Sequence, residues 1–263
     1  MYHTIPEMKT KHIAMWACPR SRSTAITRAF EQLDDCTIYD EPLDGCCFVN
    51  AFTDQGEIDY AADYLSRHAD TNYSSIVKKL TGDLPEGKSF SFQKHMSNHL
   101  LPEFDRSWLS EVKNFFLIRN PRETVLSYYK ARTASGFAWE EWESRVGWEE
   151  HYQLFKEIEH LTQKIPLVID SGDLVKNPRD YLKLLCSKLG VDFSEKMLNW
   201  ESKDTKILSW ENTTFETFSE KVINSTGFFQ EDQEDINIPD ILEPCIDKCM
   251  PFYDEMSKYR LIV

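Results

Sequence analysis

One stretch near the start of the chain specifies more of its architecture than any other: Ala14-Met-Trp-Ala-Cys-Pro-Arg-Ser-Arg-Ser-Thr-Ala-Ile-Thr-Arg-Ala-Phe30. The short apolar run at 13–17 is typical of a buried strand, and apolar residues then recur at helical spacing from Ala25 to Leu33. The turn between them leads into a helix N-terminus, which offers unpaired backbone N–H groups and a positive dipole end. This turn therefore predicts an anion site, with donors at Arg20, Ser21, Arg22, Ser23 and Thr24.

A second junction of strand and helix lies at Asn114-Phe-Phe-Leu-Ile-Arg-Asn-Pro-Arg-Glu-Thr-Val-Leu-Ser-Tyr-Tyr-Lys-Ala-Arg132. Arg119 ends the strand, and Ser127 lies two turns into the helix, so the two side chains could bracket one phosphate. The helix start has an N-cap, a proline at the first position and a capping-box acid, at Asn120, Pro121 and Glu123. Each junction alone is also compatible with an ordinary capped helix, with Ser23 or Thr24 as the cap in the first.

Together the two junctions resemble the sulfotransferase family that uses 3′-phosphoadenosine 5′-phosphosulfate (PAPS). Pro19-Arg-Ser-Arg-Ser-Thr24 resembles the family's 5′-phosphosulfate loop, with Arg20 in the basic position. Leu117-Ile-Arg-Asn-Pro-Arg-Glu-Thr-Val-Leu-Ser127 resembles its 3′-phosphate motif, in which an arginine and a later serine hold the ribose 3′-phosphate. A third match, at Val168-Ile-Asp-Ser-Gly-Asp-Leu-Val-Lys-Asn-Pro178, keeps the family's order.

Two positions depart from the family pattern. The glycine of the first loop is replaced by Arg22, so this position must accept a side chain and could offer a second guanidinium to the phosphosulfate. The tyrosine that often lies near adenine is Ser171, so the adenine contacts cannot be transferred. Further on, the segment 221–228 resembles a loop that closes over the nucleotide, although a plain turn is the alternative. Its candidate contacts are Ser225, Thr226 and Gly227.

The resemblance also implies where the acceptor's proton goes. Lys94 and His95 end a predicted strand, Ser89-Phe-Ser-Phe-Gln-Lys-His-Met96, which resembles the family segment that brings catalytic groups to the site. An ordinary histidine has a pKa near ~6.5, so His95 is the first candidate for the base. Lys94 would steady the bridging oxygen, and His99 is a neighbouring candidate at the same edge.

Glu41 is the second candidate for the base. It lies in Tyr39-Asp-Glu-Pro42, which resembles the Glu-Pro segment of carbohydrate-type sulfotransferases, where the glutamate is placed beside the acceptor. A carboxylate serves well as a base when burial raises its pKa. The sequence leaves the choice among His95, Glu41 and His99 open.

The overall composition fits one α/β domain. A chain of 263 residues with 41% hydrophobic content can close a substantial core, and no linker-like tract divides it. We expect residues 1–263 to form a single P-loop-like domain, with a central, mostly parallel sheet flanked by helices. The strands are expected at 13–17, 36–39, 89–94, 114–119 and 167–170. Segments 55–88 and 133–165 are expected to add helices over the ligand-binding edge.

The formal net charge of −14 argues against a nucleic-acid partner, because binders of phosphate backbone display a basic face. The absence of a signal-peptide core and of a membrane-length apolar stretch predicts a cytoplasmic protein without a membrane partner. Seven scattered cysteines favour reduced thiols, and no metal site is predicted. The acidic excess favours a cationic group on the acceptor.

The resemblance implies in-line transfer of a sulfuryl group from PAPS to a hydroxyl, or an amine, of a small metabolite or natural product. Arg20, Arg22 and the loop amides would stabilise the developing charge, so no metal ion is required. One alternative is a P-loop-type small-molecule kinase, but its Gly-x-x-x-x-Gly-Lys-Ser/Thr motif is absent. A noncatalytic nucleotide-binding protein is the other, and the base candidates argue against it.

Overall fold

The computed structural model describes residues 11–51, 70–134, 136, 138, 139, 143–203, 205, 221–229 and 237–263. Its centre is a five-stranded sheet with the order β2-β3-β1-β4-β5, in which every neighbouring pair is parallel. The strands are β1 (His12–Ala17), β2 (Cys36–Asp40), β3 (Phe90–Met96), β4 (Lys113–Ile118) and β5 (Leu167–Asp170). The predicted α/β class with a parallel sheet is confirmed, and each predicted strand is found.

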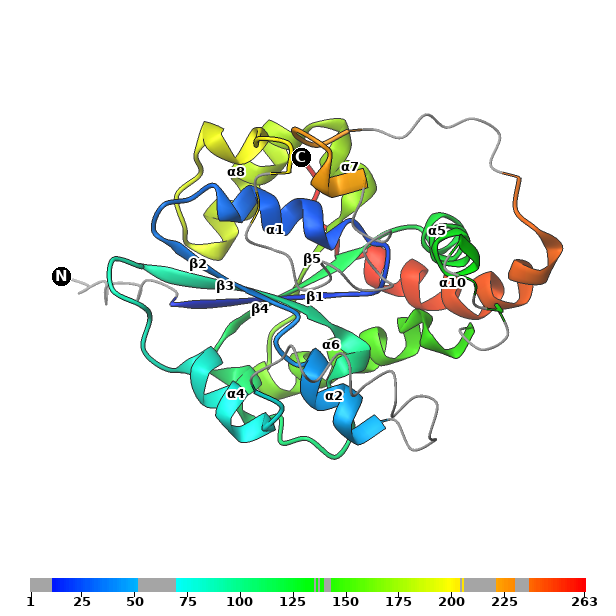
Figure 1. Ribbon diagram of the computed structural model, residues 1–263, viewed down its shortest axis with the longest axis horizontal. Helices are drawn as coiled ribbons and strands as arrows, with labels where there is room; N and C mark the ends of the chain where they lie inside the picture. Colours follow the sequence, from blue (N-terminus) through cyan, green and yellow to red (C-terminus); the bar gives the residue numbers. More distant parts are fainter. Residues whose placement is uncertain are drawn as a thin grey trace.

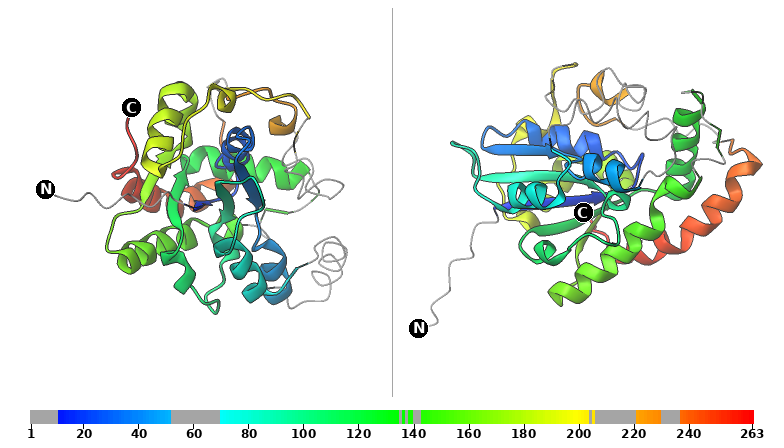
Figure 2. Two further views of the ribbon diagram at one scale, coloured as in Figure 1. Left: turned by 90° about the vertical axis from the view of Figure 1, so that its left-hand side faces the viewer. Right: turned by 60° about the horizontal axis from the view of Figure 1, so that its bottom comes forward.

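Helices cover both faces of this sheet (Figure 1). One face carries α1 (Ser23–Glu31), α7 (Ser171–Lys176) and α8 (Pro178–Leu189), and the other carries α2 (Asp44–Ala51), α4 (Tyr73–Thr81) and α6 (Trp148–Thr162). Two more helices, α5 (Pro121–Ala134) and α10 (Glu243–Ser257), pack together toward the end where the strands finish (Figure 2). The short 3-10 helices are η1 (Ser97–His99), η2 (Ser107–Ser110), η3 (Glu143–Val146), η4 (Glu195–Leu198) and η5 (Asp240–Leu242).

The strands divide the core into two clusters because successive side chains point to opposite faces. In β1, Ala14 and Trp16 belong to the cluster beneath α4 and α6, whereas Ile13, Met15 and Ala17 belong to the cluster beneath α1 and α8. All six residues of β1 are buried, as expected for a central strand covered on both sides. The alternation decides which face each functional side chain of a strand reaches.

The helices α4 and α6 cover a face of the sheet, which corrects the expectation that their segments lie over the ligand-binding edge. Ile76 and Leu80 of α4 join the same buried cluster as Phe155 and Ile158 of α6. Each helix has an apolar stripe, and a sheet face is the surface that can bury such a stripe. Residues 55–69 of the first segment lie outside the described residues.

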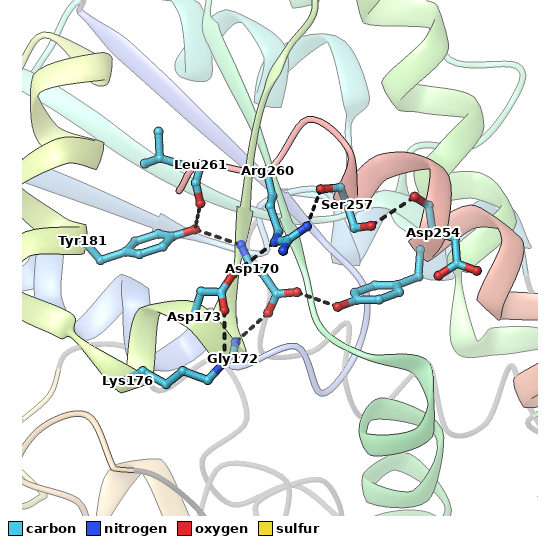
Figure 3. Close-up of polar contacts among 10 residues, drawn as sticks. Asp170, Gly172, Asp173, Lys176, Tyr181, Asp254, Ser257, Arg260 and Leu261 are labelled. Atoms are coloured by element: carbon cyan, nitrogen blue, oxygen red, sulfur yellow. Dashed lines mark hydrogen bonds and ion pairs between the residues drawn. The ribbon is translucent and has the colours of Figure 1, made fainter. Parts of the chain in front are cut away.

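The C-terminal tail runs beside the outermost strand, β5 (Figure 3). The Leu261 amide donates to the carbonyl oxygen of Val168 at 2.8 Å. The Tyr181 hydroxyl donates to the Leu261 carbonyl and accepts from the Asp170 amide, both at 3.1 Å. The Tyr253 hydroxyl of α10 donates to the Asp170 carboxylate at 2.9 Å. The tail thus bonds to an edge strand that would otherwise present unpaired backbone groups.

Among the helices that the structure describes, none is both long enough and apolar enough to cross a membrane. All seven cysteines lie in described segments as buried, free thiols.

Candidate functional site

A cavity opens where α1 begins, at the end of the sheet where β1 and β4 finish. It joins the two predicted anion motifs to α7 and to the segment 221–229, although these parts are far apart in the sequence. The residues that line it are Arg20, Arg22, Ser23, Thr24, Ala25, Arg119, Ser127, Val175, Lys221, Val222, Gly227, Phe228 and Phe229.

Side-chain contacts connect the two anion motifs within this cavity. Arg20 Nε donates to Ser127 Oγ at 3.0 Å, and Arg119 Nη1 donates to the Arg20 carbonyl oxygen at 3.0 Å. The Glu123 carboxylate accepts from Arg119 Nε at 2.9 Å and lies 3.7 Å from Arg22 Nη2. Three guanidinium groups therefore converge on one cavity, and Glu123 offsets part of their charge. Such a site suits an anion with several charged groups, because arginine forms charge-assisted, often bidentate bonds to phosphate.

The backbone of the first motif adopts an unusual conformation. Arg20 has a φ of 66° and Arg22 a φ of 70°, both in the left-handed region that glycine adopts without strain. This conformation explains why the family pattern has glycine where this chain has Arg22. Arg22 is the N-cap of α1, and its side chain makes no capping hydrogen bond. Ser23 and Thr24 lie inside the first turn of α1, so neither is its N-cap, and both face the cavity instead.

Three predicted nucleotide contacts support the loops and do not line the cavity. The Ser21 hydroxyl is buried and donates to the Cys18 carbonyl oxygen at 2.7 Å. The Ser225 hydroxyl accepts from Trp200 Nε1 at 3.2 Å, and the carbonyl oxygen of Thr226 accepts from the Trp200 amide at 3.1 Å. These polar groups are used in turns, as small hydroxyl side chains often are.

Gly227 lines the cavity and has a packing reason to be glycine. A Cβ atom at this position would lie 2.9 Å from the carbonyl oxygen of Leu198, which is closer than real Cβ contacts. The sequence predicts segment 221–228 as a loop over the nucleotide, with contacts only at Ser225, Thr226 and Gly227, and Lys221 at its start lines the cavity as well. Nothing in the sequence marks Val175, because its position depends on how α7 packs. The lining residues not predicted as contacts are Ala25, Val175, Lys221, Val222, Phe228 and Phe229, of which Lys221, Val222 and Phe228 lie within the predicted segment 221–228.

A buried lysine connects the first turn of α1 to a pair of acids. Lys94 Nζ lies 2.8 Å from both Asp40 Oδ1 and Glu41 Oε1, and donates to Thr24 Oγ1 at 3.3 Å. Burial alone would favour the neutral amine, but the Asp40 and Glu41 carboxylates outweigh it and raise the pKa of Lys94 above its usual value. Lys94 is therefore a cation held between the anion cavity and Glu41.

Glu41 has a strained backbone conformation. Its φ of 44° lies in the left-handed region, although the residue precedes Pro42, and its side chain is largely buried. Such outliers cost on the order of 1–3 kcal/mol and cluster at functional sites. The His99 ring lies between two acids, with Nδ1 4.0 Å from Glu41 Oε2 and Nε2 3.5 Å from Asp44 Oδ1.

Burial and the charges around His99 shift its pKa, and the same charges bear on metal binding. Burial lowers the pKa of His99, the Glu41 carboxylate opposes that shift, and Lys94 adds to it. Among the described residues, Glu41, Asp44 and His99 have potential metal-ligand atoms within 4.8 Å of one another. Lys94 already supplies positive charge at the Glu41 carboxylate, so the cluster suits proton transfer better than a cation site.

His95 lies on the opposite face of the sheet from Lys94, which corrects its assignment as the first candidate for the base. It is completely buried, with its ring stacked on Trp16 at a centroid distance of 4.4 Å. Its Nε2 lies 3.3 Å from Gln93 Oε1. Burial, with a smaller effect of His99, lowers the pKa of His95 to about 3. Because side chains of a strand alternate, only one of Lys94 and His95 can face α1 and the cavity.

Comparisons with known proteins show which family and which fold this chain shares. A family model described as a sulfotransferase domain matches residues 11–260. The branched-chain-amino-acid aminotransferase-like protein 2 of Arabidopsis thaliana is 28% identical over 246 residues, which are 92% of this chain and 40% of that protein. A second Arabidopsis protein of this name, protein 1, is 26% identical over 251 residues. The chain spans 40% and 42% of the lengths of these two curated relatives.

Two solved structures share the fold at low sequence identity. The sulfotransferase of Alicyclobacillus acidocaldarius has a TM-score of 0.56 and 12% identity, covering 96% of this chain and 97% of its own. The sulfotransferase domain of the Synechococcus PCC 7002 olefin synthase has a TM-score of 0.53 and 14% identity, covering 95% of this chain and 97% of its own. In both cases the similarity covers nearly the whole length of this chain.

Proposed function

We propose, since this chain belongs to the sulfotransferase domain family, that it transfers a sulfuryl group from PAPS to a hydroxyl or amine group of a small-molecule acceptor. The observation that supports this most directly is the single cavity that brings Arg20, Arg119 and Ser127 together. Its three arginines match a donor with phosphate groups at both ends of the ribose better than they match a neutral ligand.

The lining of the cavity fits PAPS. We assign the 5′-phosphosulfate to Arg20, Arg22 and the first turn of α1, and the 3′-phosphate to Arg119 and Ser127. Phe229 lines the cavity with 43% of its surface exposed, so its ring is available to stack on adenine. When bound, PAPS would supply the sulfuryl group, and 3′,5′-ADP would be the product.

Glu41 is the base in this proposal. Its carboxylate takes the proton of the acceptor's hydroxyl or amine, so that the acceptor becomes a better nucleophile. Lys94 orients the Glu41 carboxylate and keeps positive charge between it and Thr24, within the low-dielectric interior where charge acts strongly. His99 is close enough to influence Glu41, whereas His95 stays in the core.

The acceptor is proposed to be a small metabolite or natural product. The net charge of −14 supports an acceptor that also carries an amine or guanidinium group, because acidic surfaces attract cations. The guanidinium and ammonium groups of the site supply the positive charge that sulfuryl transfer needs, so we expect activity without an added metal ion.

Two measurements test the proposal. Calorimetry should show tight binding of 3′,5′-ADP and weak binding of ATP with Mg²⁺, and the reverse order would indicate a kinase. Incubation with PAPS, EDTA and pools of hydroxylated or amine-bearing metabolites should produce a compound heavier by one SO₃, detected by mass spectrometry. Binding of 3′,5′-ADP without transfer to any acceptor would indicate a noncatalytic nucleotide-binding protein.

A further inference from the structure

Arg28 is an arginine on α1 that no part of the proposed reaction uses, and it is completely buried. Its Nη1 donates to the carbonyl oxygens of Val222 at 3.0 Å and Ile223 at 3.1 Å. Its Nη2 donates to the carbonyl oxygen of Glu201 at 2.8 Å. The guanidinium carbon lies 5.4 Å from the centroid of the Trp200 ring, which adds a cation–π contact.

These acceptors belong to two segments that lie against each other. Residues 221–229, here called the wall segment, line the cavity with Lys221, Gly227 and Phe229 among others. The Lys203 amide donates to the Ile223 carbonyl oxygen at 2.9 Å, and the Trp200 amide donates to the wall segment at 3.1 Å. The wall segment is therefore bonded to residues 199–203 and to Arg28, while other side chains of the same segment line the cavity.

We propose that Arg28 is a positioning residue for the nucleotide, an inference that rests on the proposed function. The helix whose first turn forms the anion cradle also carries Arg28, which holds the opposite wall of the cavity in place. A rigid helix thus sets the separation between the phosphate-binding end and the wall. Preorganisation of this kind raises affinity because the segment need not be ordered when the ligand binds.

The planar guanidinium is essential to this role. It presents several donors in a fixed geometry and reaches three carbonyl oxygens at once. A lysine ammonium at this position would be a single point charge and could not maintain the same set of bonds. Arg28→Lys therefore keeps the positive charge but loses the simultaneous hydrogen bonds to the three carbonyl oxygens.

The test compares Arg28→Lys with a matched control, Arg106→Lys. Arg106 Nη2 also donates to two backbone carbonyls, of Leu100 at 2.9 Å and Leu101 at 3.3 Å, but it does not line the cavity. In Arg28→Lys, the Kd of 3′,5′-ADP and the KM of PAPS should rise by about tenfold, because side chains of the wall segment must then be ordered when the ligand binds. The kcat should change little, and amide exchange in 221–229 should accelerate. Arg106→Lys should leave the Kd and that exchange unchanged.

The outcomes separate this inference from the proposed function. If the unaltered protein binds 3′,5′-ADP and Arg28→Lys binds it equally well, Arg28 serves stability alone and the inference is wrong, whatever the change in Tm.

If Arg28→Lys does not fold, Trp200→Phe provides a second test, because it removes the indole N–H bond to Ser225 and weakens the contact with Arg28. That variant should raise the Kd by a smaller factor, and an unchanged Kd would also overturn the inference. If the unaltered protein does not bind 3′,5′-ADP, the proposed function fails and the inference falls with it.

Discussion

Arg119 is the residue on which discrimination between nucleotides should depend. Its side chain is largely buried and donates to the Arg20 carbonyl oxygen, and in the proposed function it binds the ribose 3′-phosphate. Charge-assisted bonds of this type contribute about 1.5–3 kcal/mol each. We therefore expect 3′,5′-ADP to bind far better than 5′-AMP, and Arg119→Ala to remove most of that preference, measured by calorimetry.

A neighbouring arginine is the control for this prediction. Arg122 pairs with Glu243 near the surface and does not line the cavity, so Arg122→Ala should keep the preference for 3′,5′-ADP. Equal affinity of the unaltered protein for both nucleotides would contradict the assignment of the 3′-phosphate site.

Glu41 is the residue on which turnover should depend. Glu41→Gln preserves the size of the side chain but removes the base, so kcat should fall by about 10²–10⁴ while the affinity for 3′,5′-ADP stays within error. The matched variant is His95→Gln, which keeps a polar group near Gln93 in the core and should retain most of the turnover. Loss of turnover in folded His95→Gln, with activity retained in Glu41→Gln, would reverse the two assignments.

At the scale of elements, the junction of β1 and α1 combines strain with function. Arg22 has a left-handed backbone conformation. A residue with a Cβ atom is less stable than glycine in this conformation by roughly 1–2 kcal/mol. The strained residue lines the cavity, so its guanidinium is placed where it could bind a ligand. The same junction leaves α1 without a side-chain cap at the end that should receive the 5′-phosphosulfate.

Arg22→Gly should therefore make the protein more stable than Arg22→Ala. Both variants lose the guanidinium and its contact with Glu123, but only glycine relieves the left-handed conformation. We expect a difference of about 1 kcal/mol in the free energy of unfolding, measured by urea denaturation without ligand. Both should bind 3′,5′-ADP more weakly than the unaltered protein. Equal stability of the two variants would show that the Arg22 backbone is not strained.

At the scale of the whole molecule, buried histidines should make the fold sensitive to acid. His95 and His151 are completely buried, and burial lowers the pKa of each to about 3, with a small opposing effect of the Leu117 backbone on His151. In the unfolded chain an ordinary histidine has a pKa near ~6.5. Below that value the unfolded state binds more protons than the folded state. These histidines therefore contribute stability that is present above about pH 6.5 and is lost as the pH falls toward 3.

The size of this effect follows from linkage. As the pH falls from roughly 6 to 4, protonation of each histidine in the unfolded chain should lower the free energy of unfolding by about 1.4 kcal/mol per pH unit. His95→Gln keeps a polar group that does not titrate near Gln93. His151→Asn keeps such a group near Ser97, whose Oγ lies 2.7 Å from His151 Nδ1. Urea denaturation of the double variant should show a shallower dependence on pH than the unaltered protein. An unchanged slope would mean that carboxylates alone cause the loss of stability.

Features that depend on neighbouring residues could be predicted from the sequence. Short apolar runs and helical spacing located all five strands and the start of α5, because backbone periodicity and capping are local properties. The sequence likewise put Arg119 at the end of a strand and Ser127 two turns into the helix that follows. The two junctions could therefore be located before any tertiary contact was known, and their interpretation as anion motifs came from the family resemblance, since each alone also fits an ordinary capped helix.

Features that depend on strand register and on distant pairing became apparent only from the three-dimensional fold. Lys94 and His95 are adjacent in the chain, but the pairing of β3 with β1 placed Lys94 toward α1 and stacked His95 on Trp16. Lys94 reaches Glu41 because β2 lies beside β3 with Asp40 opposite Lys94. The wall segment meets Arg28 across 194 positions of sequence. Such contacts are selected by how apolar faces pack together, and the pattern of one segment carries no information about the segment that will cover it.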